Sequence, residues 1–445
     1  GMGSFVTIGA NVQFNNDANP PNITITPKND LARDTVFAIN YPPGAFTQSG
    51  AGGSFVGTAY TFYSSAMKDH SLWSWGRNDE GQLGQNGSVN AFLSSPVQIG
   101  SKTNWIDLAN HSSNAWFFAA INSDGELWAW GDNEEGQLGQ NNTTYYSSPV
   151  QIPGTTWGAS RSSLGNKTHL SVGHADIWAI KTDGTLWGWG RNYSGSLGQN
   201  QTDSELTRVS SPVQVPGTTW KNVTAGYYHT FATKTDGTLW AWGDNTFGAL
   251  GQNQPNPSHR SSPVQIPGTT WDIVDNLTDK GGIALKTDGT LWSWGYNYKG
   301  ALGQNQSYPS FAGSSSPVQI PGTTWANISG YSEYGAMAVK TDGTLWTWGS
   351  NDRGQLGHNN TSDESSPKQV PGTSWSIDRK KIQGNYFSAL AIKTDGTFWA
   401  WGRNQRGQLG QNNVVQYSSP VQIPGTNYIT VGVCNYCSFA LREQS

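Results

Sequence analysis

The sequence has few charged residues, no basic run and no long apolar run. Of its 445 residues only 13% are charged, and the formal net charge is −4. A nucleic-acid partner normally requires a basic face, so we expect no binding of DNA or RNA. The apolar runs are far shorter than the roughly 18 residues that a membrane helix needs, which predicts no membrane span. A neutral surface rich in Ser, Thr, Asn and Gln favours an extracellular or virion-associated protein over a cytoplasmic one.

Cysteine is nearly absent. Cys434 and Cys437 form one Cys-x-x-Cys near the C-terminus, and no second pair accompanies it. A single pair does not complete a zinc site, and no βαβ pattern surrounds it to indicate redox chemistry. We therefore interpret these residues as two structural or incidental thiols.

Helical periodicity is missing as well, whereas tryptophan is abundant. Trp-x-Trp-Gly recurs seven times at intervals of 52 to 59 residues, which marks a repeat architecture. The seven copies begin at Trp73, Trp128, Trp187, Trp240, Trp292, Trp346 and Trp399. Six further tryptophans close the repeat units, at Trp105, Trp157, Trp220, Trp271, Trp325 and Trp375. Twenty of the 22 tryptophans are thus explained by architecture, and function must be sought elsewhere.

Each repeat unit divides into four short β-type segments. In the unit with the clearest boundaries they cover residues 223–226, 230–234, 238–243 and 263–266. Asp236-Gly237 lies between the second and third segments and is a signal for a two-residue hairpin turn. Four antiparallel strands repeated seven times predict an all-β fold, a seven-bladed β-propeller of four-stranded antiparallel blades. Residues i and i+2 of a strand face the same side, so both tryptophans of a pair should point one way.

The repeat covers residues 55–445, and residues 1–54 lie outside it. We interpret residues 1–54, with strand-like segments at 23–26 and 35–40, as an N-terminal arm or attachment segment. First- and second-strand material occurs eight times, once near Phe55 and again from Tyr428 onward. Either the C-terminal strands pair into the first blade, or one copy packs outside the ring.

The unit ALKTDGTLWSWGYNYKGALGQN, from Ala284 to Asn305, resembles the regulator of chromosome condensation repeat. All seven units show Trp-Gly-x-Asn followed by Gly-x-Leu-Gly, and the resemblance implies a seven-bladed propeller. The founding members are nucleotide exchange factors for a small GTPase and bind chromatin. This chain lacks the basic face that chromatin binding would require, and it keeps the family's His mainly at His229. Its regular Trp-x-Trp-Gly form is more similar to bacterial or phage-type arrays, which implies a protein-binding module.

Comparison of the seven repeats with one another separates two sets of loops. In an up-and-down blade, the loops after strands one and three open on one face, and those after strands two and four open on the other. The second set consists of near-uniform turns, whereas the first set varies and is rich in aromatic residues, as interaction surfaces are. We predict that the variable face binds a partner through Trp116, His174, Asp176, Tyr227, Tyr228, His229, Tyr331, Glu333, Tyr334, Tyr386, Phe387 and Tyr436.

The main functional interpretation is a non-enzymatic propeller that recognises a protein. A glycan-binding propeller and an exchange factor for a small GTPase are the alternatives; similar pockets repeated around the ring would favour sugar, and one asymmetric patch would favour protein. The recurrent Asp residues belong to hairpin turns, and the seven histidines lack metal-ligand spacing. The stretch 132–136 lacks the ligand pattern of a calcium loop. We therefore expect no catalytic residue, no metal and no cofactor, while the oligomeric state stays open.

Overall fold

The computed structural model divides the chain into two compact units, Gly1–Lys68 and Asp69–Ser445. The residues described are 10–15, 22–27, 36–39, 60–63, 69–87, 91–111, 115–158, 169–254, 258–277, 280–331 and 334–444. The first unit contains two antiparallel strand pairs, β1 (Ala10–Asn15) with β2 (Asn22–Pro27) and β3 (Val36–Ile39) with β4 (Tyr60–Tyr63). The strand-like segments expected at 23–26 and 35–40 correspond to β2 and β3.

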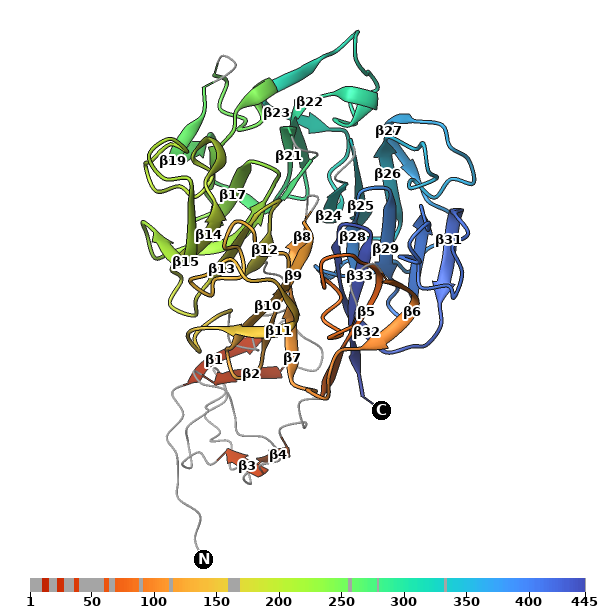
Figure 1. Ribbon diagram of the computed structural model, residues 1–445. Coiled ribbons are helices and arrows are strands. Elements are labelled where there is room, and N and C mark those ends of the chain that lie inside the picture. Colours follow the sequence, from red (N-terminus) through yellow and green to blue (C-terminus); the bar gives the residue numbers. More distant parts are fainter. Residues whose placement is uncertain are drawn as a thin grey trace, which may run out of the picture. The chain divides into compact units, whose positions relative to one another are not determined.

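The second unit is a seven-bladed propeller of four-stranded antiparallel blades, as predicted (Figure 1). The first strands of consecutive blades contact one another and therefore surround the axis of the ring. One extra strand, β8 (Asn110–His111), pairs in parallel with the first strand of blade three. Within the described ranges, no helix is long and apolar enough to cross a membrane.

Blades two to four follow the chain in simple order. Blade two contains β7 (Trp105–Leu108), β9 (Phe117–Asn122), β10 (Leu127–Gly131) and β11 (Tyr146–Ile152). Blade three contains β12 (Leu170–Val172), β13 (Asp176–Ile180), β14 (Leu186–Arg191) and β15 (Arg208–Val215). Blade four contains β16 (Trp220–Ala225), β17 (His229–Lys234), β18 (Leu239–Gly243) and β19 (Arg260–Ile266), close to the segments expected from the sequence.

Blades five to seven repeat this order, and three short 3-10 turns follow third strands. Blade five contains β20 (Trp271–Asn276), β21 (Gly281–Lys286), β22 (Leu291–Tyr296) and β23 (Gly313–Ile320). Blade six contains β24 (Trp325–Tyr331), β25 (Gly335–Lys340), β26 (Leu345–Gly349) and β27 (Glu364–Gln369). Blade seven contains β28 (Ile382–Gly384), β29 (Ser388–Ile392), β30 (Phe398–Gly402) and β31 (Tyr417–Ile423). The turns are η2 (Tyr193–Gly195), η3 (Thr246–Gly248) and η5 (Tyr298–Gly300).

Blade one is built from both ends of the repeat array. Its strand order is β32 (Tyr428–Cys434), β33 (Cys437–Glu443), β5 (His70–Asn78) and β6 (Ala91–Gln98). The register pairs Phe439 with Ser74 and Leu441 with Leu72. Of the two arrangements left open by the sequence, the C-terminal strands therefore pair into the first blade, whereas Tyr60–Tyr63 pairs with β3 in the first unit.

The second tryptophan of each pair joins its blade to the preceding one. These seven indoles are fully buried, and each donates its N–H to a backbone carbonyl of the preceding blade at 2.8 to 2.9 Å. The first tryptophan of each pair is only half-buried. The residue between them is small because a bulky ring covers it: a Cβ at Gly188 would lie 2.6 Å from the ring of Trp178 on the paired strand of the same blade, and that ring packs on Trp242 of blade four. Both faces of each blade are thus used for packing.

The asparagine of Trp-Gly-x-Asn holds its own turn together. In blade two, the buried Asn133 accepts a hydrogen bond from the N–H of Leu138 at 2.8 Å and donates to the carbonyl of Thr144 at 2.9 Å. The equivalent N–H to Asn bond occurs in the other six blades. The Gly-x-Leu-Gly segment therefore has the same backbone in every blade, and variation is confined to the residues around it.

Candidate functional site

The turns after second strands are self-contained hydrogen-bonded units. In blade four, Asp236 accepts hydrogen bonds from the N–H and hydroxyl of Thr238, and these bonds lower the pKa of its carboxyl group. The hydroxyl of Thr238 accepts a hydrogen bond from the Trp240 indole at 2.9 Å, and the Lys234 ammonium lies 4.3 Å from the centre of that ring. The same contacts recur in blades three, five, six and seven. Because these side chains bond within their own turn, we interpret the face formed by these turns as scaffold.

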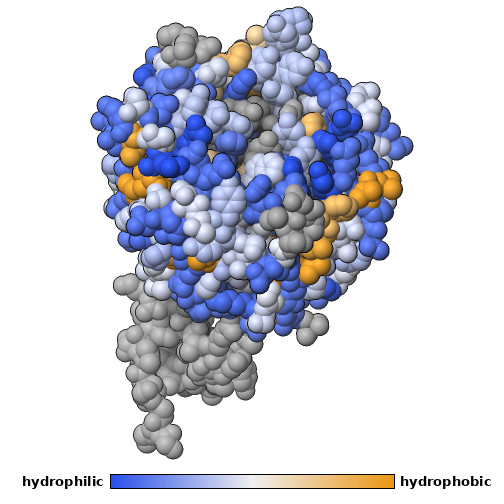
Figure 2. Space-filling model, in the orientation of Figure 1, coloured by the Kyte–Doolittle hydropathy of each residue, from blue (hydrophilic) through white to orange (hydrophobic). Residues whose placement is uncertain are grey.

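Loops after first and third strands meet on the variable face and form three aromatic clusters. Contacts between neighbouring blades link their side chains, so each cluster spans a seam of the ring. Hydrophobic residues on the surface shown in Figure 2 occur as separate small patches on a mostly hydrophilic background. The aromatic members of the clusters mostly carry polar tips, which suits reversible recognition.

The first cluster, which we name the histidine–tyrosine cluster, lies between blades three and four. It consists of His174, Tyr193, Tyr227 and Tyr228. The His174 ring stacks on Tyr227 with centres 4.0 Å apart, and Tyr193 lies 3.9 Å from Tyr228. Burial, with a smaller effect of Arg191, lowers the pKa of His174 to about 4. The imidazole is therefore neutral near pH 7 and acts as an aromatic ring, not as a cation.

The second cluster, the tyrosine patch, spans blades four to six. It consists of Phe247, Tyr296, Tyr298, Tyr308 and Tyr334. Phe247 lies 4.4 Å from Tyr296, and Tyr298 lies 4.9 Å from Tyr334. Phe247, Tyr298 and Tyr308 are 41%, 38% and 52% exposed, which makes this the most open of the three clusters. Of these five residues only Tyr334 was predicted as a site residue. The others lie at the end of a third strand or in the loop after it. The sequence shows that these loops vary, but it does not show that side chains from different blades meet.

The third cluster, the arginine–aromatic cluster, spans blades seven, one and two. It consists of Arg77, Trp116, Tyr386, Phe387, Arg403 and Tyr436. The guanidinium of Arg77 lies 3.9 Å from the centre of the Trp116 ring, and Arg403 donates a hydrogen bond to the Tyr436 hydroxyl at 2.8 Å. Trp116, Tyr386, Phe387 and Tyr436 were predicted from the sequence. The two arginines were missed as members because each is placed by a ring from another blade.

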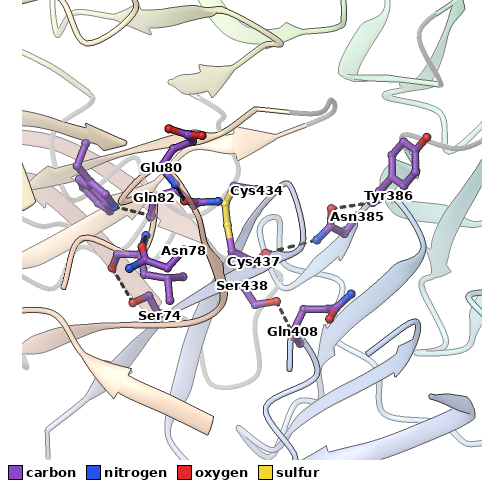
Figure 3. Close-up of a disulfide and its surroundings, with 12 residues drawn as sticks. Ser74, Asn78, Glu80, Gln82, Asn385, Tyr386, Gln408, Cys434, Cys437 and Ser438 are labelled. Carbon is purple, nitrogen blue, oxygen red and sulfur yellow. Dashed lines mark hydrogen bonds between the residues drawn. A yellow bond between two sulfur atoms is a disulfide. The ribbon is translucent and has the colours of Figure 1, made fainter. Parts of the chain in front are cut away.

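A disulfide fixes the loop that carries Tyr436. Cys434 and Cys437, interpreted from the sequence as thiols, are bonded to each other in the structure (Figure 3). That interpretation was wrong because the two-residue turn between β32 and β33 brings their Cα atoms within 5.0 Å, a separation that suits a disulfide. Asn385 of blade seven donates a hydrogen bond to the Cys437 carbonyl at 3.3 Å. Tyr436 adopts a φ of +55° and is held between these anchors.

Three of the predicted site residues lie below the surface. Asp176, His229 and Tyr331 are 5%, 1% and 1% exposed. The Tyr331 hydroxyl donates to the carbonyl of Gln355 at 2.9 Å, while burial raises the pKa of Asp176 to about 8 and lowers the pKa of His229 to about 4. These side chains support the loops rather than reach outward. Glu333 lies outside the described residues.

The axis of the ring is filled by buried polar groups. Asp275 of blade five accepts hydrogen bonds from Thr224 at 2.9 Å and from the N–H of Gly330 at 3.1 Å, which tie it to blades four and six. Arg379 of blade seven donates to Asn222 of blade four at 2.9 Å. The cavity beside these groups is about 20 Å³ and holds one water molecule at most. It has no room for a substrate.

The described residues contain no group of three or more His, Cys, Asp or Glu side chains that could hold a metal ion. In the stretch that resembled a calcium loop, Asp132 accepts a hydrogen bond from the N–H of Glu134 at 2.9 Å and so belongs to its own turn. Burial raises the pKa of this carboxyl group. Asp132 is therefore a turn-forming group, and the Glu135 carboxylate pairs with Arg191 at 2.9 Å.

Sequence comparison identifies the repeats. The family profile described as "RCC1-like domain" matches residues 55–322, and the profile "Regulator of chromosome condensation (RCC1) repeat" matches residues 342–382 and 395–441. The chain is 28% identical over 354 residues to the ultraviolet-B receptor UVR8 of Arabidopsis thaliana, covering 78% of this chain and 76% of that protein. It is 27% identical over 368 residues to the human E3 ubiquitin-protein ligase HERC2, of whose length it spans only 7%.

Structure comparison gives the same fold. Prp20p from Saccharomyces cerevisiae superimposes with a TM-score of 0.72 at 18% identity, covering 85% of this chain and 93% of Prp20p. Human WBSCR16 superimposes with a TM-score of 0.70, also at 18% identity, covering 84% of this chain and 100% of WBSCR16. Sequence identities this low support a shared fold and do not support a shared function. These relatives are from a plant, a yeast and humans; the likeness to bacterial or phage-type arrays stays a prediction.

Proposed function

The chain belongs to the regulator of chromosome condensation repeat family, and from this premise we propose that it is a non-enzymatic propeller that binds a protein through its variable face. The observation that carries the proposal is the contrast between the two faces. One face repeats the same internally bonded turn in five blades, whereas the other gathers three clusters of aromatic and cationic side chains at seams between blades. Exposed Tyr, Trp and Arg are the residues that dominate binding energy at protein interfaces.

The composition of the clusters favours a protein over a glycan. The three clusters differ from one another: one is built on His174 and tyrosines, one on exposed tyrosines, and one on arginines stacked against rings. A sugar-binding propeller would be expected to present the same aromatic pocket in several blades. An asymmetric face fits one extended partner that contacts different blades with different side chains.

The solved relatives support a binding role. Yeast RCC1 (Prp20) has been solved bound to Kap60, and Prp20p has been studied for its binding to Gsp1p and histones. The ligase HERC2 matches this chain over only a small part of its length. The proposal assigns this chain recognition without catalysis, because its axial groups are bonded to one another around a water-sized cavity and the recurrent aspartates of the Asp-Gly pairs form turns.

An extracellular or virion-associated location is part of the proposal. The disulfide between Cys434 and Cys437 supports it, because disulfides form and persist in oxidising compartments and are rare in the cytosol. The low charge and the polar, neutral surface are consistent with the same setting.

Site-specific photo-crosslinking tests the binding face. We would introduce p-benzoylphenylalanine in place of Tyr228, Tyr298 or Tyr386, one in each cluster, and in place of Thr269 or Thr323 in the uniform turns as matched exposed controls. After irradiation with extract from the native source, adducts should form at the first three positions and not at the two threonines. The captured protein is then purified and titrated against wild type. Adducts of equal yield at both faces would refute the proposal.

A further inference from the structure

The tyrosine patch has a surface relief that is suited to one kind of ligand. The rings of Tyr296 and Tyr298 are nearly parallel, with an interplanar angle of 6° and centres 6.0 Å apart. Tyr334 stands at 75° to Tyr296 and at 70° to Tyr298. Rings that meet at such angles form an uneven surface, whereas coplanar rings would form a flat platform. The patch is also open, since Tyr308 at its border is 52% exposed.

The polar groups of the patch are hydrogen-bond donors. Among the described residues, the hydroxyls of Tyr296, Tyr298 and Tyr308 make no hydrogen bond with another protein group. The Lys280 ammonium lies 4.9 Å from the Phe247 ring and adds a cation on the same surface. The surface therefore fits a ligand with flat apolar groups and with carbonyl acceptors that the tyrosine hydroxyls can reach.

A proline-rich segment in the polyproline II conformation has this chemistry. Prolyl rings are compact and apolar, and proline has a backbone carbonyl acceptor without an N–H donor. The conformation exists before binding, so little ordering entropy is lost, and aromatic furrows are how folded domains recognise such segments. Resting on the proposed function, which gives this face to a protein partner, we propose that the tyrosine patch binds a proline-rich segment of that partner.

Two other modes of binding are less consistent with the patch. Addition of a β-strand requires an exposed sheet edge, whereas the patch is made of side chains from loops and turns of three blades. Single-stranded nucleic acid also stacks on aromatic rings, but it needs a positively charged groove. Lys299, the second lysine nearby, is already paired with Asp352 and Asp363, and the whole chain carries a net charge of −4.

The test is a titration of fluorescein-labelled decaproline with the full chain, followed by fluorescence anisotropy. A Gly-Ser peptide of equal length and an oligothymidylate with the same label serve as parallel probes. Decaproline should bind saturably and more tightly than either. Tyr298→Ala and Tyr308→Ala should each weaken binding by about 5-fold or more, the loss that truncation of an interface anchor produces. Tyr145→Ala, which changes a tyrosine of similar exposure (39%) on a blade-two loop, should leave binding within about 2-fold.

Three outcomes would overturn the inference: decaproline binding no better than the Gly-Ser peptide, binding unaffected by both Tyr298→Ala and Tyr308→Ala, or preferential binding of oligothymidylate. Tyr298→Phe separates the contributions of ring and hydroxyl, because it keeps the aromatic ring and removes the hydroxyl group. The inference and the proposed function fail in distinguishable ways. If decaproline does not bind but the crosslinker at position 298 still captures a partner, only the proline-rich ligand is rejected. If neither binds, the role of the variable face is rejected as well.

Discussion

The indole N–H of Trp75 donates a hydrogen bond to the carbonyl oxygen of Gln408 at 2.9 Å, across a sequence separation of 333 residues. It is one of the bonds that join blade one to blade seven, and it repeats the indole bond found between neighbouring blades elsewhere in the ring. For Trp242, the corresponding bond to the carbonyl of Ser196 is 2.8 Å. The ring is therefore closed by an ordinary blade seam.

Substitution of Trp75 tests this closure. Trp75→Phe removes a buried hydrogen bond and part of a fully buried ring, so we expect a loss of about 2 to 3 kcal/mol in the free energy of unfolding, measured by urea denaturation. Trp242→Phe should cost the same amount, whereas Trp73→Phe, at a half-buried position, should cost less than about 1 kcal/mol. A Trp75→Phe protein as stable as wild type would show that the C-terminal strands do not close the ring.

Gly76 tests the seam between β5 and β33. It has a φ of +103°, and a Cβ there would lie 2.4 Å from the carbonyl oxygen of Tyr436. Gly76→Ala should therefore cost about 3 kcal/mol or more, or prevent folding. Gly100→Ala is the matched control, because Gly100 also has a positive φ, +56°, but nothing lies within 4 Å of its added Cβ. It should cost only about 1 to 2 kcal/mol. Equal losses would mean that backbone strain, and not the close approach, decides the effect.

Asp275 should make stability depend on pH. Burial raises its pKa to about 6 in the folded protein, against about 4 when unfolded. Between these values the folded protein keeps a proton that the unfolded chain has released, so the stability due to this residue falls as pH rises from about 4 to about 6. Asp275→Asn cannot titrate. The unfolding free energy of wild type minus that of the variant should decrease by up to about 3 kcal/mol over this window.

Urea denaturation of both proteins at steps across the window measures that difference. Asp236→Asn serves as the control, because hydrogen bonds from Thr238 lower the pKa of the exposed Asp236 carboxyl, so its contribution to stability is complete above about pH 4 and stays constant across the window. A difference between wild type and Asp275→Asn that stays constant with pH would contradict the prediction.

The disulfide between Cys434 and Cys437 should stabilise the turn at Tyr436. Thiol alkylation of the unfolded, unreduced protein should label neither cysteine, and reduction should expose both. Closing so short a loop is worth about 2 kcal/mol on the chain-entropy account, and the Cys434→Ser, Cys437→Ser double variant should lose about that much. Two labelled cysteines before reduction would restore the interpretation of these residues as thiols.

Much of the fold could be predicted because the repeat carries local signals. The Asp236-Gly237 hairpin, the asparagine of each Trp-Gly-x-Asn and the alternation around each tryptophan pair all act within one blade. Closure of the ring could not be predicted, since the segments near Phe55 and from Tyr428 carry the same strand pattern. Only pairing with β5 distinguishes them, and that pairing joins residues far apart in the sequence.

The candidate site was predicted as a set of loops but not as clusters. Tyr228 and Phe387 were found from loop composition, yet their neighbours Tyr193 and Arg403 belong to the loops after third strands. Asp176, His229 and Tyr331 were expected on the surface but are buried, because a residue at a strand end turns inward or outward according to register and local packing. Whether the exposed members bind a partner stays a prediction.

Blade one also has a consequence for biosynthesis. On the ribosome, β5 and β6 emerge early and β32 and β33 last, so the nascent protein is an open arc with β5 as an unpaired edge until translation has passed Glu443. A premature stop codon between Ile423 and Tyr428 would release that arc with every other blade complete. Chaperone dependence of this protein should therefore be concentrated at the stage of translation just before the strands that close the circle appear.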